Sequence, residues 1–259
     1  MKYSVKIGWL YPELMSTYGD RGNILVLQKR CLWRGIEAKI VEINEDSTAK
    51  ELESVDLIFG GGAQDREQEL VIADLRKKRD SLAKKIEENV PALFVCGAPQ
   101  LLGKFYEPES GNRIEGLGIF DMRTVHPGHK SQRLIGNIIA RVNWSHLPYS
   151  TNFSANKTIV GFENHGGRTK LGKSAVPFAH VISGHGNNDE DKTEGVIHKN
   201  AIGCYFHGPL LPKNPQIADW LISTALRVKY DDIVPLPTLD DTLSDMARGM
   251  IAEKMGVKL

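Results

Sequence analysis

Cys96 is the residue with the clearest potential for covalent chemistry, because it joins an apolar run, residues 92–95, to Gly97. A reactive side chain on a sharp turn from a strand into a helix has the geometry of a nucleophile elbow. Such a turn projects the sulfur out of the sheet, and a helix N-terminus favours the thiolate form of a cysteine. The alternative is a buried, unreactive cysteine, which is common for this residue type.

Three consecutive glycines, Gly60, Gly61 and Gly62, follow the preceding apolar run and could hold an oxyanion. If the two runs are neighbouring parallel strands, their carboxyl ends meet at one edge of the sheet and the glycines lie beside Cys96. Glycine permits close backbone approach and unusual torsions. We therefore expect the Gly62 and Gly97 amides to form an oxyanion hole, although the same glycines would also suit a plain tight turn.

A cysteine nucleophile needs a base, and His207 is the best placed of the eight histidines. It ends an apolar run and precedes Gly208 and Pro209, so it should emerge at the edge of a sheet. His165, which two glycines follow, is the competing candidate. The other histidines lie in loops or charged surroundings, where we expect solvated or structural roles.

The first 110 residues, which must position Cys96, alternate between strand-like and helix-like patterns. Short apolar runs predict four strands, over residues 5–10, 38–43, 56–59 and 91–95. Apolar residues at helical spacing predict two helices, over residues 23–34 and 67–88. The second helix is expected to bury a stripe of apolar residues, namely Leu70, Ile72, Leu75, Leu82 and Ile86. This alternation is typical of an α/β fold with a mostly parallel central sheet flanked by helices.

After residue 110 the pattern changes to short β-like runs between Gly-, Asn- and Pro-rich turns. These runs lie at residues 119–125, 134–142, 158–162, 180–183 and 195–198. Helical patterns return at residues 217–228 and from residue 239 onwards. We predict a single domain over residues 1–259. It comprises a βαβ half (1–110), a smaller antiparallel, loop-rich half that carries the histidine (111–210), and C-terminal helices (211–259).

Composition excludes several classes of function. The 259 residues, 41% of them hydrophobic and 25% charged, suit a globular domain. A net charge of +1 gives no electrostatic reason to expect nucleic acid or an anionic membrane as partner. No apolar run reaches the roughly 18 residues of a membrane span, and the three cysteines have neither disulfide nor zinc spacing. We expect a cytoplasmic protein without a metal site.

Several segments, taken in their order and spacing, resemble the triad-type (class I) glutamine amidotransferases, in the branch related to cobyric acid synthase. The segments are residues 14–23, 59–65, 96–97 with 100–103, 113–118, 133–136, 161–165 and 205–209. Within that branch the resemblance is strongest to the GatD subunits, the glutaminase subunits of lipid II isoglutaminyl synthase. It implies the class I glutamine amidotransferase fold.

The resemblance also implies roles for individual residues. Cys96 would attack the side-chain carbonyl of L-glutamine, and His207 would serve as base for the thiol and acid for the departing ammonia. Gly61 and Gln100 match positions at the bound glutamine. Arg133 matches the arginine that holds the substrate carboxylate, for which a guanidinium fork is well suited.

The third member of the triad is missing from its usual place. Most of the class has Glu two residues after the histidine, where this chain has Pro209. A histidine without an orienting acceptor loses control of its tautomer and position. Asp20, Glu163 or a carboxylate of a partner subunit could substitute. We favour the partner, because the glutaminase would then stay idle until its synthetase is docked.

The resemblance implies a partner as well, a MurT-like Mur ligase subunit that forms a heterodimer with this chain. Ammonia would convert the D-glutamate of the lipid II stem peptide to D-isoglutamine, a step of peptidoglycan biosynthesis in the cell wall. Lipid II would be reached through the partner. ATP and Mg²⁺ would bind there too, because the chain has no P-loop, so we expect no cofactor in this chain.

Three other functions stay open. The chain could serve another synthetase, as in cobyrinate-type amidation, but we would expect a fused synthetase domain there and 259 residues leave no room for one. It could be a cysteine hydrolase that acts alone on a small amide, which the missing Glu mildly favours. It could also be an inactive regulatory subunit. The joint presence of Cys96, His207, Gln100 and Arg133 argues against that.

Overall fold

A six-stranded sheet with the order β13-β14-β4-β3-β1-β2 forms the centre of the protein. The computed structural model describes residues 2–153 and 157–259. The strands are β1 (Tyr3–Leu10), β2 (Ile36–Ile43), β3 (Leu57–Gly60), β4 (Ala92–Val95), β13 (Val196–His198) and β14 (Ala201–Cys204). All neighbours pair in parallel except β13, which runs antiparallel to β14. The predicted mostly parallel α/β sheet is therefore confirmed.

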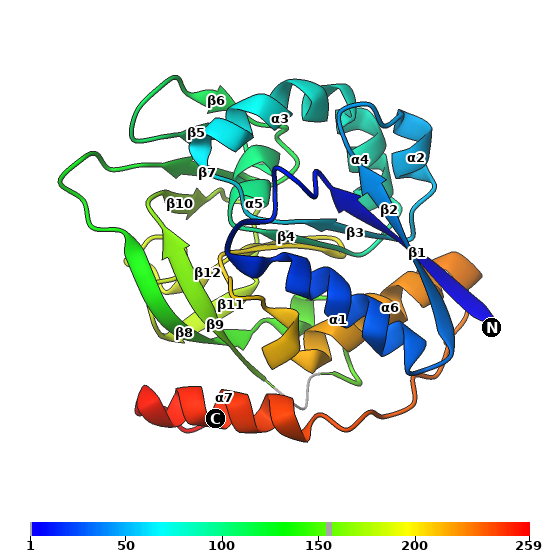
Figure 1. Ribbon diagram of the computed structural model, residues 1–259. Helices are drawn as coiled ribbons and strands as arrows, with labels where there is room; N and C mark the ends of the chain where they lie inside the picture. The colour runs from blue at the N-terminus through cyan, green and yellow to red at the C-terminus, as the bar shows by residue number, and fades with distance from the viewer. Residues whose placement is uncertain (1, 154–156) are drawn as a thin grey trace.

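Helices cover both faces of this sheet (Figure 1). One face is covered by α1 (Arg21–Leu32) and α6 (Pro215–Tyr230). The other is covered by α2 (Ala49–Glu53), α3 (Asp65–Lys77) and α4 (Arg79–Glu87). Every residue of the central strands β3 and β4 is buried, which explains why both read as continuous apolar runs.

The predicted helix over residues 67–88 is wrong in two respects. It is broken at Lys78, which ends α3 and begins α4. The buried Lys78 ammonium pairs with Asp74 and donates to the Glu45 carbonyl oxygen, so a tertiary contact competes with a continuous helix. Leu70 is 52% exposed, and its neighbour Val71 is buried instead.

Two four-stranded sheets lie beside the central one, with the orders β10-β7-β5-β6 and β12-β11-β8-β9. Their strands are β5 (Phe105–Glu107), β6 (Ile114–Glu115), β7 (Met122–Val125), β8 (Leu134–Val142), β9 (Thr158–His165), β10 (Arg168–Leu171), β11 (Ala179–Ser183) and β12 (Thr193–Glu194). Their pairs are antiparallel except β5 with β7. β13 and β14, although late in the chain, join the central sheet, and this brings the segment that follows β14 next to β4.

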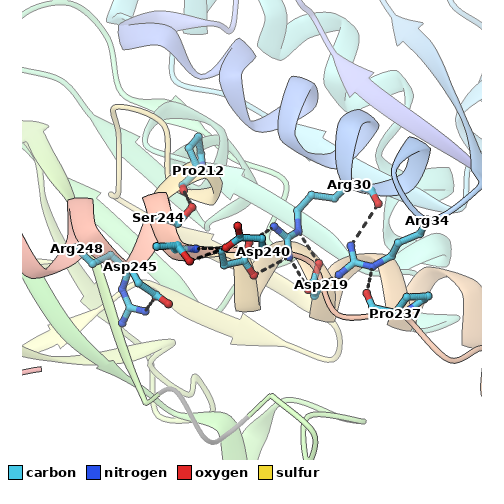
Figure 2. A network of polar contacts seen from close by, with 11 residues as sticks. Arg30, Arg34, Pro212, Asp219, Pro237, Asp240, Ser244, Asp245 and Arg248 are labelled. Atoms are coloured by element: carbon cyan, nitrogen blue, oxygen red, sulfur yellow. Dashed lines mark hydrogen bonds and ion pairs between the residues drawn. The ribbon is translucent and has the colours of Figure 1, made fainter.

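The C-terminal helix α7 (Thr242–Lys254) packs along β8 and β9, at the bottom of Figure 1. Figure 2 shows the polar network that holds this part of the chain. Arg30 on α1 bonds Asp219 on α6 and Asp241 just before α7. Ser244 donates to the Pro212 carbonyl oxygen at 2.8 Å. Among the helices of the described residues, none is long and apolar enough to cross a membrane.

Candidate active site

Cys96 occupies the turn between β4 and α5 (Gly97–Leu102), with φ 53° and ψ −96°. A positive φ is unfavourable for a residue with a side chain, and such strain is concentrated at functional sites. The backbone N–H of Cys96 donates to the Cys204 carbonyl oxygen on β14 at 2.8 Å, which helps to hold the turn. The nucleophile candidate thus lies on a strained elbow at the carboxyl edge of the sheet.

His207 reaches this edge because β14 pairs in parallel with β4. Its side chain is fully buried, and its backbone pairs with Phe162 on β9. Burial opposes a charge on His207. Electrostatic interactions with Cys96 and with the carboxylate of Asp20, and hydrogen bonds to both, outweigh burial and raise the pKa of His207 to about 10. The protonated form of His207 is therefore favoured beside Cys96.

Asp20, one of the two in-chain candidates for the third triad position, contacts His207. The fully buried Asp20 follows the short 3-10 helix η1 (Thr17–Gly19), and its Oδ1 is 3.4 Å from His207 Nδ1. Glu163 instead accepts the backbone N–H groups of His185 and Gly186, each at 2.8 Å. Glu163 therefore fixes the loop after β11, whereas Asp20 faces the histidine.

A pocket of about 320 Å³ opens beside Cys96. Gln100 and Arg133 also line it, so the candidate nucleophile and the two side chains expected at the substrate meet there. The loop of Gly61 and Gly62 passes next to Cys96. A Cβ on Gly62 would lie 2.8 Å from His207 Cε1, and one on Gly61 would collide with the Met15 carbonyl oxygen.

His165, the competing base, lies in the pocket wall in a different role. Its ring stacks on Tyr205 at 3.9 Å, and its Nδ1 bonds the Gly167 carbonyl oxygen at 2.9 Å. Burial lowers the pKa of His165 to about 3. The ring is therefore neutral at ordinary pH and shapes the wall of the pocket.

Gln100 belongs to a buried network that the sequence did not reveal. Its Oε1 accepts from Gln68 Nε2 at 2.9 Å, and its Nε2 donates to Tyr205 Oη at 3.2 Å. Gln68 also donates to the Ala63 carbonyl oxygen at 3.2 Å. The network ties the glycine loop to α5. Gln68 could not be identified beforehand, because only the packing of α3 against α5 brings it to Gln100.

Arg133 lies at the far side of the pocket, just before β8. Its Nε donates to Asn164 Oδ1 at 3.0 Å, and one terminal nitrogen donates to the Asn164 carbonyl oxygen at 3.2 Å. The other terminal nitrogen lies beside Gly166 in the pocket wall. Asn164 thus orients a guanidinium that can receive a carboxylate.

Comparison with known proteins shows the family to which this chain belongs. The model of the CobB/CobQ-like glutamine amidotransferase domain matches residues 6–215. The chain belongs to this family. Among solved structures, this amidotransferase resembles a glutamine amidotransferase crystal structure (TM-score 0.56, 16% identity, 85% of this chain and 98% of the other). It also resembles the Trypanosoma brucei CTPS glutaminase domain with bound acivicin (0.57, 13%, 90% and 96%). At these identities the likeness concerns the fold alone.

Curated relatives are closer in sequence. A chain of Streptococcus pneumoniae named "Lipid II isoglutaminyl synthase (glutamine-hydrolyzing) subunit GatD" is 39% identical over 93% of this chain and 88% of its own length. The Staphylococcus aureus protein of the same name is 43% identical over 84% and 82%. A probable cobyric acid synthase of Methanosphaera stadtmanae is 30% identical over 67% of this amidotransferase but only 33% of its own length.

Proposed function

We propose that this amidotransferase is the glutamine-hydrolysing subunit of a lipid II isoglutaminyl synthase. The observation that carries the proposal is that His207 interacts with Cys96, which lines one pocket together with Arg133. The two relatives named GatD, similar over more than four fifths of each chain, support the substrate and the pathway. The product, ammonia, amidates the D-glutamate of the lipid II stem peptide during peptidoglycan synthesis.

The reaction proceeds through a thioester. The Cys96 sulfur forms a bond to the side-chain carbonyl carbon of L-glutamine, and the carbonyl oxygen becomes an oxyanion. His207 gives its proton to the departing nitrogen as the C–N bond breaks, and ammonia leaves. His207 then takes a proton from water, which attacks the thioester and releases glutamate. Arg133 holds the substrate carboxylate, and Gln100 lines the same pocket.

The partner in this proposal is a MurT-like ligase subunit, with which the chain forms a cytoplasmic heterodimer. ATP, Mg²⁺ and lipid II bind to the partner, and this chain supplies ammonia. The names of the relatives describe a subunit of a synthase, which supports a complex of this kind. Cobyrinate-type amidation has less support, because the cobyric acid synthase relative is 30% identical to this chain, whereas the two relatives named GatD are 39% and 43% identical.

Two sources remain for the acid that orients His207. Asp20 lies 3.4 Å from His207 Nδ1, which supports a triad completed within the chain. A partner carboxylate would instead make activity depend on docking. The chain alone, without ligase, discriminates between them: measurable hydrolysis supports Asp20, and activity that needs the ligase supports a site completed by the partner.

The test of the proposed function is ammonia release from L-glutamine by the chain with a MurT-like ligase, beside a Cys96→Ala control. We expect release that depends on Cys96 and that drives amidation of lipid II when ATP is present. A formed complex that releases no ammonia would leave only the regulatory role. Ammonia release without amidation of lipid II would point to another synthetase.

A further inference from the structure

A chain of five buried, hydrogen-bonded side chains runs from the wall of the pocket to the strands β7 and β10. Its members are, in order, Gln68, Gln100, Tyr205, Thr169 and Thr124. Gln68 and Gln100 line the pocket together with Cys96. One end of the chain therefore lies at the place where the proposed substrate binds.

A backbone carbonyl sets the direction of the hydrogen bonds in this chain. Gln68 Nε2 donates to the Ala63 carbonyl oxygen at 3.2 Å and to Gln100 Oε1 at 2.9 Å. A carbonyl oxygen can only accept, so Gln68 has to turn its nitrogen, and not its oxygen, toward Ala63. Gln100 then meets a donor on that side, and its own oxygen has to face Gln68.

The loop that carries the Ala63 carbonyl is itself held in place. The neighbouring Gly62 N–H donates to the buried Asp20 Oδ2 at 2.6 Å, and the Gly62 carbonyl oxygen accepts from the Thr17 N–H at 3.1 Å. The oxyanion role predicted for the Gly62 N–H does not fit this contact with Asp20. Because both polar groups of Gly62 are engaged, the carbonyl of the next residue is a stationary acceptor for Gln68.

Tyr205 holds the opposite end of the Gln100 amide. Gln100 Nε2 donates to Tyr205 Oη at 3.2 Å, so the hydroxyl accepts there and can give its own hydrogen to Thr169 Oγ1 at 2.5 Å. The Tyr205 ring is stacked on His165 at 3.9 Å. The Gln100 amide therefore has a donor fixed at its oxygen and an acceptor fixed at its nitrogen.

We propose that Gln68 and Tyr205 are positioning residues that hold the Gln100 amide in one orientation for the binding of L-glutamine. An amide oxygen has two lone pairs, and an amide nitrogen has two hydrogens. After the contacts with Gln68 and Tyr205, Gln100 keeps one acceptor site and one donor site, each in a set place. The inference rests on the proposed glutaminase function and adds the residues that prepare its pocket for the substrate.

The benefit of this arrangement is preorganisation. The two ends of an amide have nearly the same size, so without Gln68 and Tyr205 the amide could turn over. The acceptor and donor sites would then be exchanged, and a substrate group that pairs with one orientation would be mismatched with the other. An amide held in advance avoids the cost of ordering it when the substrate binds. Gln68 and Tyr205 thus act on binding through Gln100.

The first experiment removes the donor at the start of the chain. Gln68→Met keeps the length of the side chain but cannot donate a hydrogen bond. In the complex with the ligase, we expect KM for L-glutamine to rise about fivefold to tenfold, the size of a lost hydrogen bond. The kcat should stay within about threefold, because Gln68 donates to neither Cys96 nor His207. Glu69→Met, at the exposed neighbouring position on α3, is the control and should change neither constant more than twofold.

The second experiment separates positioning from a merely structural role. Gln100→Met removes the amide that Gln68 is proposed to hold. In this background Gln68→Met should change KM less than twofold, because there is no longer an amide to orient. A rise in KM by the same factor in both backgrounds would overturn the inference, since it would show that Gln68 acts without Gln100. A loss of kcat with an unchanged KM would overturn it as well.

Tyr205→Phe tests the other end of the Gln100 amide and also serves if Gln68→Met does not fold. It removes the acceptor of Gln100 Nε2, so the same rise in KM is expected, again absent in the Gln100→Met background. A KM within twofold of the unmodified value would overturn the inference. Ammonia release by the unmodified complex is the separate check on the proposed function. Without release, the proposed function fails and the inference with it; with release and an unchanged KM in the variants, only the positioning role fails.

Discussion

The two ends of α1 carry charged clusters with opposite properties. At its N-terminal end Asp20 and His207 are fully buried, and they adjoin a cysteine with a strained backbone. At its C-terminal end Arg30 makes four hydrogen bonds to Asp219 and Asp241, whose side chains are 16% and 28% exposed. Burial opposes the charge of Arg30, but these bonds raise its pKa.

The two clusters differ because one serves the reaction and the other serves the stability of the fold. In the C-terminal cluster the guanidinium is saturated by carboxylates, so it joins α1, α6 and the segment before α7 into one unit (Figure 2). In the active site a carboxylate, an imidazole and a thiol are buried together and are joined by few hydrogen bonds. Such an arrangement is costly to fold, and buried groups of this kind are concentrated at functional sites.

The largest effect on turnover should come from His207. His207→Asn removes the acid for ammonia and the base for water, so we expect kcat of the complex to fall by about 10³-fold. His180→Asn, at an exposed site on β11, is the matched control and should change kcat less than twofold. Steady-state glutamine hydrolysis measures both. Equal activities of the two variants would remove His207 from the mechanism.

The cluster at the C-terminal end of α1 should affect stability and leave turnover nearly unchanged. Arg30→Ala leaves the partly buried carboxylates of Asp219 and Asp241 without their main partner, so we expect the free energy of unfolding to fall by about 3 kcal/mol. The kcat of the folded protein should stay within twofold of the unmodified value. Lys29→Ala, one residue earlier and exposed, should cost less than about 0.5 kcal/mol. Denaturant titration distinguishes them, and loss of kcat without loss of stability would contradict the comparison.

Arg133 should affect binding more than turnover. Arg133→Lys keeps the charge but loses the fork, so we expect KM for glutamine to rise about tenfold, with kcat within a few-fold. Arg123→Lys, exposed on β7, is the control. An unchanged KM would show that another group receives the substrate carboxylate.

The smallest change should be a shift in pH dependence. Above its pKa, His207 loses the proton that departing ammonia needs, so kcat/KM should decline at alkaline pH, near pH 10 in the unmodified protein. Asp20 raises that pKa, and Asp20→Asn should therefore move the alkaline limb to lower pH. Glu13→Gln, exposed and close in sequence, should leave the limb in place. A limb that does not move in Asp20→Asn would separate Asp20 from His207.

The sequence was sufficient for the parts of the site that follow from strand ends. Parallel strands meet at one edge, so the apolar runs before Gly60 and Cys96 placed these residues together, as the pairing of β3 with β4 shows. Other parts depend on tertiary contacts. Asp20 and His207 are 187 positions apart, and nothing local indicates that their side chains meet. The helix break at Lys78 likewise depends on its buried contacts with Asp74 and the Glu45 carbonyl oxygen.

The most direct test of the central claim is to trap the intermediate. The complex is incubated with L-glutamine, quenched with acid and digested, and the peptides are examined by mass spectrometry. The account predicts a glutamyl group in thioester linkage on the peptide that contains Cys96, absent from Cys96→Ala. No adduct during active turnover, or an adduct confined to Cys31 or Cys204, would contradict it.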